Sequence, residues 1–245
     1  MNRTIRRRFW VVGSACSLGV LSPIWGPTVL REIPVFGVEE TRVLGAQFVT
    51  REVIEGLAAL GEGISVWDDM RPVEEVVAGH PLVESARIHR SGIHRLDIEV
   101  REVEPIALAA TPVLVPLDAS GQRVPIDLSI HTVDLPVLLG AEISESGRVE
   151  PEAARRALDV LAQLSAVNSG FTSRISSMLP LGNEAVEFVL LPESSVRRVI
   201  LPFRDAVKAF LRVESAVGMA EIQRPVAAAD ARFRGEVILR LEGRG

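Results

Sequence analysis

The sequence contains a single cysteine, Cys16, among its 245 residues. One cysteine cannot form an intrachain disulfide, and it cannot supply the sulfur ligands of a structural zinc site. The chain also lacks a Gly-x-Ser-x-Gly nucleophile elbow, a glycine-rich phosphate-binding loop and a His-Glu-x-x-His zinc motif. These absences remove the most recognisable sequence signatures of hydrolases, nucleotide-binding enzymes and zinc proteases.

The four histidines are the remaining candidates for a metal site. A two-residue turn at Ser91-Gly92 places His89 and His94 opposite each other on paired strands. Such a pair still needs a third or fourth ligand, and the sequence indicates none, so a polar cross-strand pair is the preferred interpretation. The adjacent carboxylates Asp68 and Asp69 are expected to cap the next helix. The sequence therefore predicts no catalytic residue, no cofactor and no metal ligand.

Acidic residues are absent from the first thirty positions, which contain Arg3, Arg6, Arg7 and Arg8. Without these four, 23 basic residues face 32 acidic ones, so residues 31–245 carry a net charge of about −9. An acidic body argues against DNA and RNA as partners.

One long uncharged segment, Phe9 to Leu30, separates Arg8 from Arg31. As a helix, its 22 residues extend about 33 Å, close to the hydrocarbon thickness of a bilayer. The arginines before it and the glutamates after it place residues 1–8 in the cytoplasm. The sequence thus predicts a transmembrane helix at residues 9–30, in contact with the lipid bilayer, and export of the remaining chain.

Two other interpretations of this segment stay open. Glycines, serines, Pro23 and Pro27 dilute its hydrophobicity, so a cleaved signal peptide with Arg6–Arg8 as its basic part is the first alternative. A lipoprotein signal around Cys16 is the second, and it fits less well because Gly13 stands where a large aliphatic residue is expected.

The exported part begins with a pattern of one strand, two helices and two further strands. A short strand is expected within residues 38–44. Thr50 is a good N-cap for a helix through Leu60, ended by the glycines that follow, and a second helix is expected from Pro72 to Ala78. The apolar residues on one face of the first helix are Val53, Ile54, Leu57 and Leu60.

A hairpin is expected next, because apolar and charged residues alternate from Leu96 to Arg101 after the turn at Ser91-Gly92. This alternation predicts a sheet with one buried face and one solvated face, with Asp97 on the solvated one.

Short apolar runs broken by proline and glycine dominate the sequence from Pro105 onward. A helix is expected after Pro151, with Ala154, Leu158, Leu161 and Leu164 on one side. Further strands are expected at 175–179, 186–191, 196–201, 226–233 and 236–241, with a helix near 203–213. The whole pattern predicts an α+β protein without internal repeats, with a small domain at 37–104 and a mixed, mainly antiparallel β domain with helices at 105–245.

Six short stretches with recognisable motifs occur in order along the exported part. They are Val66 to Asp69, His80 to Ile88, Leu96 to Glu102 followed by Pro105-Ile106-Ala107, Leu117 to Gly121, Leu135 to Gly140, and Ala229 to Phe233. In this order and spacing they resemble the FtsQ/DivIB family of bacterial cell-division proteins. With the N-terminal anchor, the resemblance covers nearly the whole chain. It implies a polypeptide-transport-associated (POTRA) domain at residues 37–104, of order β-α-α-β-β, and a C-terminal β domain.

The resemblance also implies a function. Proteins of this family are non-enzymatic scaffolds of the divisome at the division septum, anchored in the cytoplasmic (inner) membrane with the main body outside, and they help regulate septal peptidoglycan synthesis. The implied partners are single-pass coiled-coil proteins of the FtsB/DivIC and FtsL types, with other divisome proteins reached through the POTRA domain. A partner strand is expected to pair with an exposed edge within Ala229–Leu239. The candidate partner-binding residues are Ala229, Asp230, Arg232, Phe233, Arg234 and Val237.

Two other functions remain as alternatives. A POTRA-containing secretion or outer-membrane assembly component guides unfolded chains by the same edge pairing, but such proteins usually carry several POTRA units or a barrel of alternating strands. An exported hydrolase needs a nucleophile or a metal set that the sequence does not contain.

Overall fold

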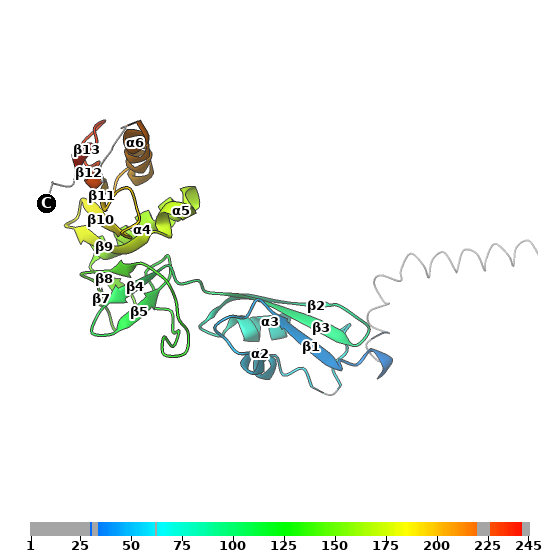
Figure 1. Ribbon diagram of the computed structural model, residues 1–245. Coiled ribbons are helices and arrows are strands. Elements are labelled where there is room, and N and C mark those ends of the chain that lie inside the picture. The colour runs from blue at the N-terminus through cyan, green and yellow to red at the C-terminus, as the bar shows by residue number, and fades with distance from the viewer. Residues whose placement is uncertain (1–29, 31–33, 62, 220–225, 242–245) are drawn as a thin grey trace, which may run out of the picture. The chain divides into compact units, whose positions relative to one another are not determined.

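The computed structural model describes residue 30 and residues 34–61, 63–219 and 226–241. Within this part the chain is an α+β protein that divides into two compact units after Glu102 (Figure 1). They are called unit 1, through Glu102, and unit 2, from Val103. The predicted transmembrane helix at residues 9–30 lies outside the described residues except for Leu30. No helix in the described ranges is both long enough and apolar enough to cross a membrane.

Unit 1 has the strand and helix order that the sequence predicted. Its elements are the 3₁₀ helix η1 (Pro34–Phe36), β1 (Glu40–Leu44), α2 (Arg51–Ala58), α3 (Arg71–Ala78), β2 (Val83–Arg90) and β3 (Arg95–Glu102). Strand β3 is central, parallel to β1 and antiparallel to β2. Both helices lie on the same side of this sheet (Figure 1). On that side Leu96, Ile98 and Val100 of β3 are buried, as their alternation predicted.

Helix α2 differs from its prediction in two respects. Val53, expected on the buried face, is 43% exposed, whereas Ile54 and Ala58 are buried. These two residues are four positions apart and share a face, and Val53 is rotated by about 100° from Ile54. The helix also ends before the glycines, because Ala59 adopts a left-handed conformation with a φ of 45°.

The turn between β2 and β3 is longer than predicted. The ladder pairs Ile88 with Ile98 and Arg90 with Leu96, so residues 91–94 form the turn. A two-residue turn at 91–92 pairs Ile88 with Arg95 and places an arginine on the buried face. The observed register instead matches apolar residues on that face, which is the usual determinant of strand register.

Unit 2 is built on an eight-stranded mixed sheet, in the order β13-β12-β11-β10-β9-β6-β4-β5. The strands are β4 (Ala107–Ala110), β5 (Leu114–Leu117), β6 (Val137–Leu138), β9 (Ile175–Leu181), β10 (Ala185–Leu190), β11 (Arg198–Pro202), β12 (Val226–Asp230) and β13 (Ile238–Leu241). Antiparallel pairs outnumber parallel ones, as predicted. The short strands β7 (Glu142–Ile143) and β8 (Val149–Glu150) pair separately.

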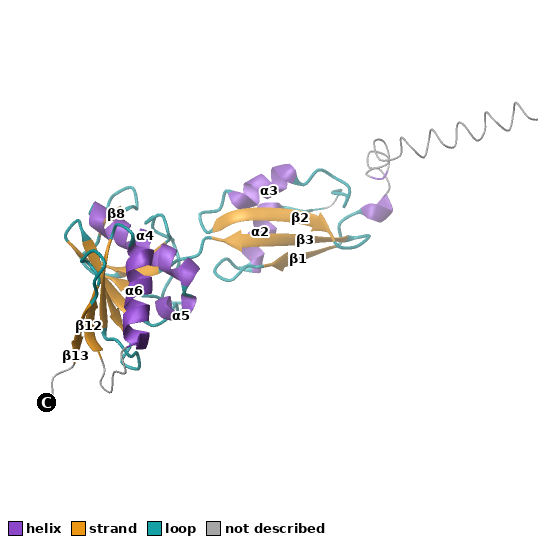
Figure 2. Ribbon diagram, turned by 90° about the horizontal axis from the view of Figure 1, so that it is seen from above, coloured by secondary structure: helices purple, strands orange, loops and turns teal. Residues whose placement is uncertain are grey.

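The helices of unit 2 lie against one face of the large sheet (Figure 2). They are α4 (Glu152–Val167), α5 (Ser169–Thr172) and α6 (Ala206–Met219). The predicted face of α4 is confirmed: Ala154, Leu158, Leu161 and Leu164 are all buried. Helix α6 begins later than expected, at Ala206, after Asp205 in a left-handed conformation with a φ of 53°. The aromatic core includes Phe171 and Phe210, whose ring centroids are 4.5 Å apart.

Candidate functional site

The predicted partner-binding residues belong to two different strands and the loop between them. Ala229 and Asp230 are in β12, which pairs with β11 on one side and with β13 on the other. Strand β12 is therefore interior, and the prediction that these two residues form an exposed edge is wrong. The strand predicted at 226–233 ends at Asp230, and the chain turns back so that β13 becomes the edge strand.

Strand β13 presents an amphipathic edge. Ile238 is 43% exposed and Leu241 is 50% exposed, whereas Val237 and Leu239 pack against the core of unit 2. Since side chains alternate along a strand, Ile238 and Arg240 share the outer face. The predicted residue Val237 therefore lies just before the edge strand and faces inward, and Ile238 is the apolar residue that faces solvent.

Asp230 and Arg232, two of the candidate partner-binding residues, form an ion pair. The guanidinium Nη2 of Arg232 lies 2.7 Å from Oδ2 of Asp230, and Nε lies 3.0 Å from Oδ1. The backbone N–H of Arg232 donates to Oδ1 as well, at 3.1 Å. These hydrogen bonds hold the pKa of the largely buried Asp230 carboxyl below its usual value and raise the pKa of Arg232. The pair fixes the chain where it leaves β12.

The next two predicted residues, Phe233 and Arg234, lie in the loop that leads to β13. Phe233 is 48% exposed, and Arg234 is exposed. Gly235 takes a φ of 79°, which a residue with a side chain rarely adopts, and this allows the chain to reverse. The loop thus places an exposed aromatic ring and a cation beside the edge strand.

The candidate metal-binding histidines and the candidate carboxylate Asp69 of unit 1 contact other residues of unit 1. His89 pairs with Asp97 in the ladder, and His94 lies in the turn with its Nδ1 3.9 Å from Oε1 of Glu39, so the predicted His89–His94 pair is wrong. Asp69 accepts from the backbone N–H of Arg71 at 3.2 Å, at the start of α3. Among the residues that the structure describes, no group of three or more His, Cys, Asp or Glu side chains is arranged to hold a metal ion.

No family model matches the sequence. The chain is 31% identical over 157 residues to the cell division protein FtsQ of Myxococcus fulvus, and the matched region covers 62% of this chain and 54% of that protein. This similarity supports the resemblance to the FtsQ/DivIB family. It spans about half the length of the curated relative that it matches.

In the two main sheets, three of the four outer strands have a backbone group that already makes a hydrogen bond outside the sheet. In β1 the carbonyl of Thr41 accepts from Nη2 of Arg51 at 2.6 Å. In β2 the N–H of Ile88 donates to Oε1 of Glu74 at 2.7 Å. In β5 the carbonyl of Pro116 accepts from the N–H of Val124 at 2.9 Å, and proline itself has no N–H to offer.

Strand β13 is different. In the described part of the chain, β13 pairs with β12 alone, and no side chain or loop donates to or accepts from its outer side. A strand edge of this kind can accept the backbone of another extended segment. Among the described residues, the outer backbone groups of β13 thus have no partner, and this edge lies beside Phe233.

One buried polar group, Asp97, could not be recognised from the sequence. It was expected on the solvated face, but it is 3% exposed, because Nη2 of Arg42 lies 2.5 Å and Oγ of Ser91 lies 2.7 Å from its carboxylate. The two neighbouring groups cover it and satisfy its hydrogen bonds. Asp97 is therefore a structural group of unit 1.

Proposed function

We propose that this chain is a non-enzymatic scaffold of the bacterial division machinery that holds a partner strand along β13. Two observations support the proposal: the similarity to a protein named cell division protein FtsQ, and the open edge at β13. The partners are single-pass coiled-coil proteins of the FtsB/DivIC and FtsL types, and the assembly helps regulate septal peptidoglycan synthesis.

Strand addition at β13 gives the partner two kinds of contact. Its backbone extends the eight-stranded sheet, which supplies affinity without regard to sequence. Specificity comes from side chains along the edge, and here these are Ile238, Arg240 and the loop residue Phe233, all exposed. An apolar residue in the partner can cover Ile238 and part of the Phe233 ring, and burial of such groups contributes about 25 cal/mol per Å² of apolar surface.

The remaining parts of the proposal concern position in the cell. Residues 9–30 anchor the chain in the cytoplasmic membrane with the N-terminus inside, and both units act on the outer side of that membrane. Unit 1 is a POTRA domain, a proposal supported by its β-α-α-β-β order and its β1-β3-β2 sheet. This unit provides a second surface for other divisome proteins.

The test is a crosslinked pull-down of the tagged full chain from its own host, analysed by mass spectrometry. Ile238→Asp places a charge on the open edge, and Phe233→Asp changes the loop beside it. The matched control is Leu114→Asp on β5, because Leu114 is 48% exposed at the opposite edge of the same sheet, close to Ile238 at 43%.

Small single-span coiled-coil proteins are expected with the native chain and with Leu114→Asp, and their recovery is expected to fall about tenfold or more with Ile238→Asp. If they are recovered equally with all variants, the scaffold function stands and the β13 site is wrong. Recovery of secretion or outer-membrane assembly proteins instead overturns the division function.

A further inference from the structure

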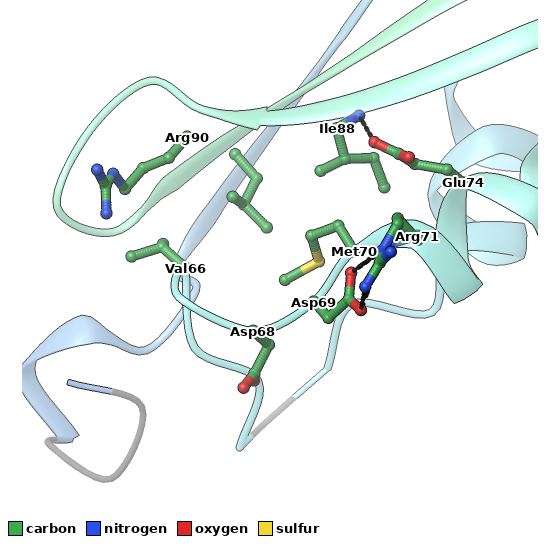
Figure 3. A pocket seen from close by; sticks show the side chains of 9 residues that line it. Val66, Asp68, Asp69, Met70, Arg71, Glu74, Ile88 and Arg90 are labelled. Atoms are coloured by element: carbon green, nitrogen blue, oxygen red, sulfur yellow. Dashed lines mark hydrogen bonds and ion pairs between the residues drawn. The ribbon is translucent and has the colours of Figure 1, made fainter. Parts of the chain in front are cut away.

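Glu74 connects helix α3 to the edge strand β2. Its Oε1 accepts the backbone N–H of Ile88 at 2.7 Å, and Figure 3 shows the carboxylate reaching the strand from the helix. A hydrogen bond from a backbone amide to a carboxylate is about twice as strong as one between neutral groups. The contact therefore occupies a backbone donor in the middle of an outer strand.

The Ile88 N–H points away from the sheet. Successive residues of a strand direct their backbone groups alternately toward one neighbour and toward the other. Ser91 directs its N–H inward, to the carbonyl of Arg95 in β3, so Ile88, three residues earlier, directs its N–H outward. By the same alternation the amides of Ala86 and Arg90 also face the open side of β2.

The space beside Glu74 is not filled by other side chains. A surface pocket of about 330 Å³ adjoins the carboxylate, with an apolar lining contributed by Val66, Met70, Ile88 and Leu96. At its rim Arg71 is held by Asp69, with Nη2 and Oδ2 2.7 Å apart (Figure 3). Neighbouring side chains therefore do not shield β2 at Ile88 by their size. The Glu74 carboxylate is the group that accepts the outward-facing N–H of Ile88.

We propose that Glu74 closes the β2 edge against antiparallel pairing with β2 of a second copy of this chain. Exposed strand edges are templates for such pairing, and proteins commonly block them with charged side chains. The inference concerns unit 1 and does not depend on the function proposed for β13.

The strand that fits the unblocked edge best is β2 itself, centred on Ile88. In that register the Ile88 N–H of each copy donates to the Ile88 carbonyl of the other, so both bonds to Glu74 are replaced. Ile88 already pairs with Ile98 on the buried side of unit 1. The paired copies then share a continuous apolar row, Ile98–Ile88 followed by the same two residues of the second copy, which is a favourable cross-strand arrangement.

The experiment measures self-association of the full chain in mild detergent by sedimentation velocity over a concentration series. Glu74→Ala removes the carboxylate, and Glu74→Asp keeps the charge but shortens the side chain by one methylene, so that it no longer reaches Ile88. Glu74→Gln keeps an acceptor at the same reach. Glu75→Ala is the matched control, because Glu75 is the next residue of α3 and is exposed.

Glu74→Ala and Glu74→Asp are expected to raise the association constant about tenfold or more, because pairing no longer displaces two charged hydrogen bonds. Glu74→Gln and Glu75→Ala are expected to stay within about threefold of the native chain. Using both Ala and Asp keeps the test valid if one variant fails to fold.

Amide hydrogen exchange identifies the surface that associates. In Glu74→Ala the Ile88 amide is expected to exchange faster than in the native chain at low concentration and to regain protection as concentration rises. An unchanged association constant in both variants overturns the inference. Association that protects β13 and not Ile88 also overturns it, and that outcome leaves the function proposed for β13 unaffected.

Discussion

Arg42 of β1 and Asp97 of β3 form an ion pair across the solvated face of unit 1, with Nη2 2.5 Å from Oδ2. The two residues are direct partners in the parallel ladder. The same carboxylate accepts from Oγ of Ser91 in the turn after β2. One buried acid thus joins the first strand of the unit, its central strand and the tip of its hairpin.

This arrangement predicts acid sensitivity in unit 1. The hydrogen bonds from Arg42 and Ser91 hold the pKa of Asp97 below its usual value of 3.8. Because the folded state has the lower pKa, the stabilisation is fully present above about pH 4 and is lost as pH falls through the folded pKa. Asp97→Asn is expected to lower the urea midpoint of unit 1 at pH 7 and to reduce the further loss between pH 7 and pH 3.

The control for this prediction is Glu99→Gln, two residues along the same face of β3. Glu99 is exposed, and its carboxylate makes no hydrogen bond or ion pair with the described residues. If Asp97→Asn and Glu99→Gln have the same urea midpoint at both pH values, the Arg42–Asp97–Ser91 group does not stabilise unit 1.

Arg232 is expected to stabilise the end of β12 as well as to face a partner. Replacement by methionine leaves the buried Asp230 carboxylate without its guanidinium, and the expected loss in free energy of unfolding is about 1 kcal/mol, a moderate value because Arg232 is half exposed. Arg234→Met, in the same loop, is expected to change stability by less than about 0.5 kcal/mol. Chemical denaturation checks both values, and equal stability of the two variants contradicts the structural role of Arg232.

Gly45, at the end of β1, is expected to tolerate no side chain. Its φ is 82°, and a Cβ atom placed there lies 2.2 Å from the carbonyl oxygen of Val100. Gly45→Ala is expected to destabilise unit 1 by about 2 kcal/mol or more, from the left-handed conformation and the backbone clash together. Gly63 has a similar φ of 91° but no atom within 4 Å, so Gly63→Ala isolates the conformational cost of about 1 kcal/mol. Thermal unfolding that gives the same loss for both variants contradicts the clash.

Local patterns predicted the elements that bury one regular face. The spacing of Leu158, Leu161 and Leu164 specifies a helix, and the alternation of Leu96 and Ile98 specifies a strand, because burial follows the period of each backbone. The ion pair between Asp230 and Arg232 was also within reach of the sequence, since its members are two residues apart. Contacts of this kind depend on residues close together in the chain.

The site itself was decided by contacts between distant segments. Asp97 and Glu99 have the same place in the alternating pattern, yet Asp97 is buried because Arg42 approaches it from 55 residues away. Likewise β12 and β13 have similar sequence signals, and β13 is the open edge because β12 pairs in parallel with β11, about thirty residues earlier. The sequence by itself determined the helices and strands that bury one regular face, such as α4 and β3. Only the tertiary structure decided which strand lies at the edge and which carboxylates are covered, because strand order and burial depend on pairing between segments that no local pattern encodes.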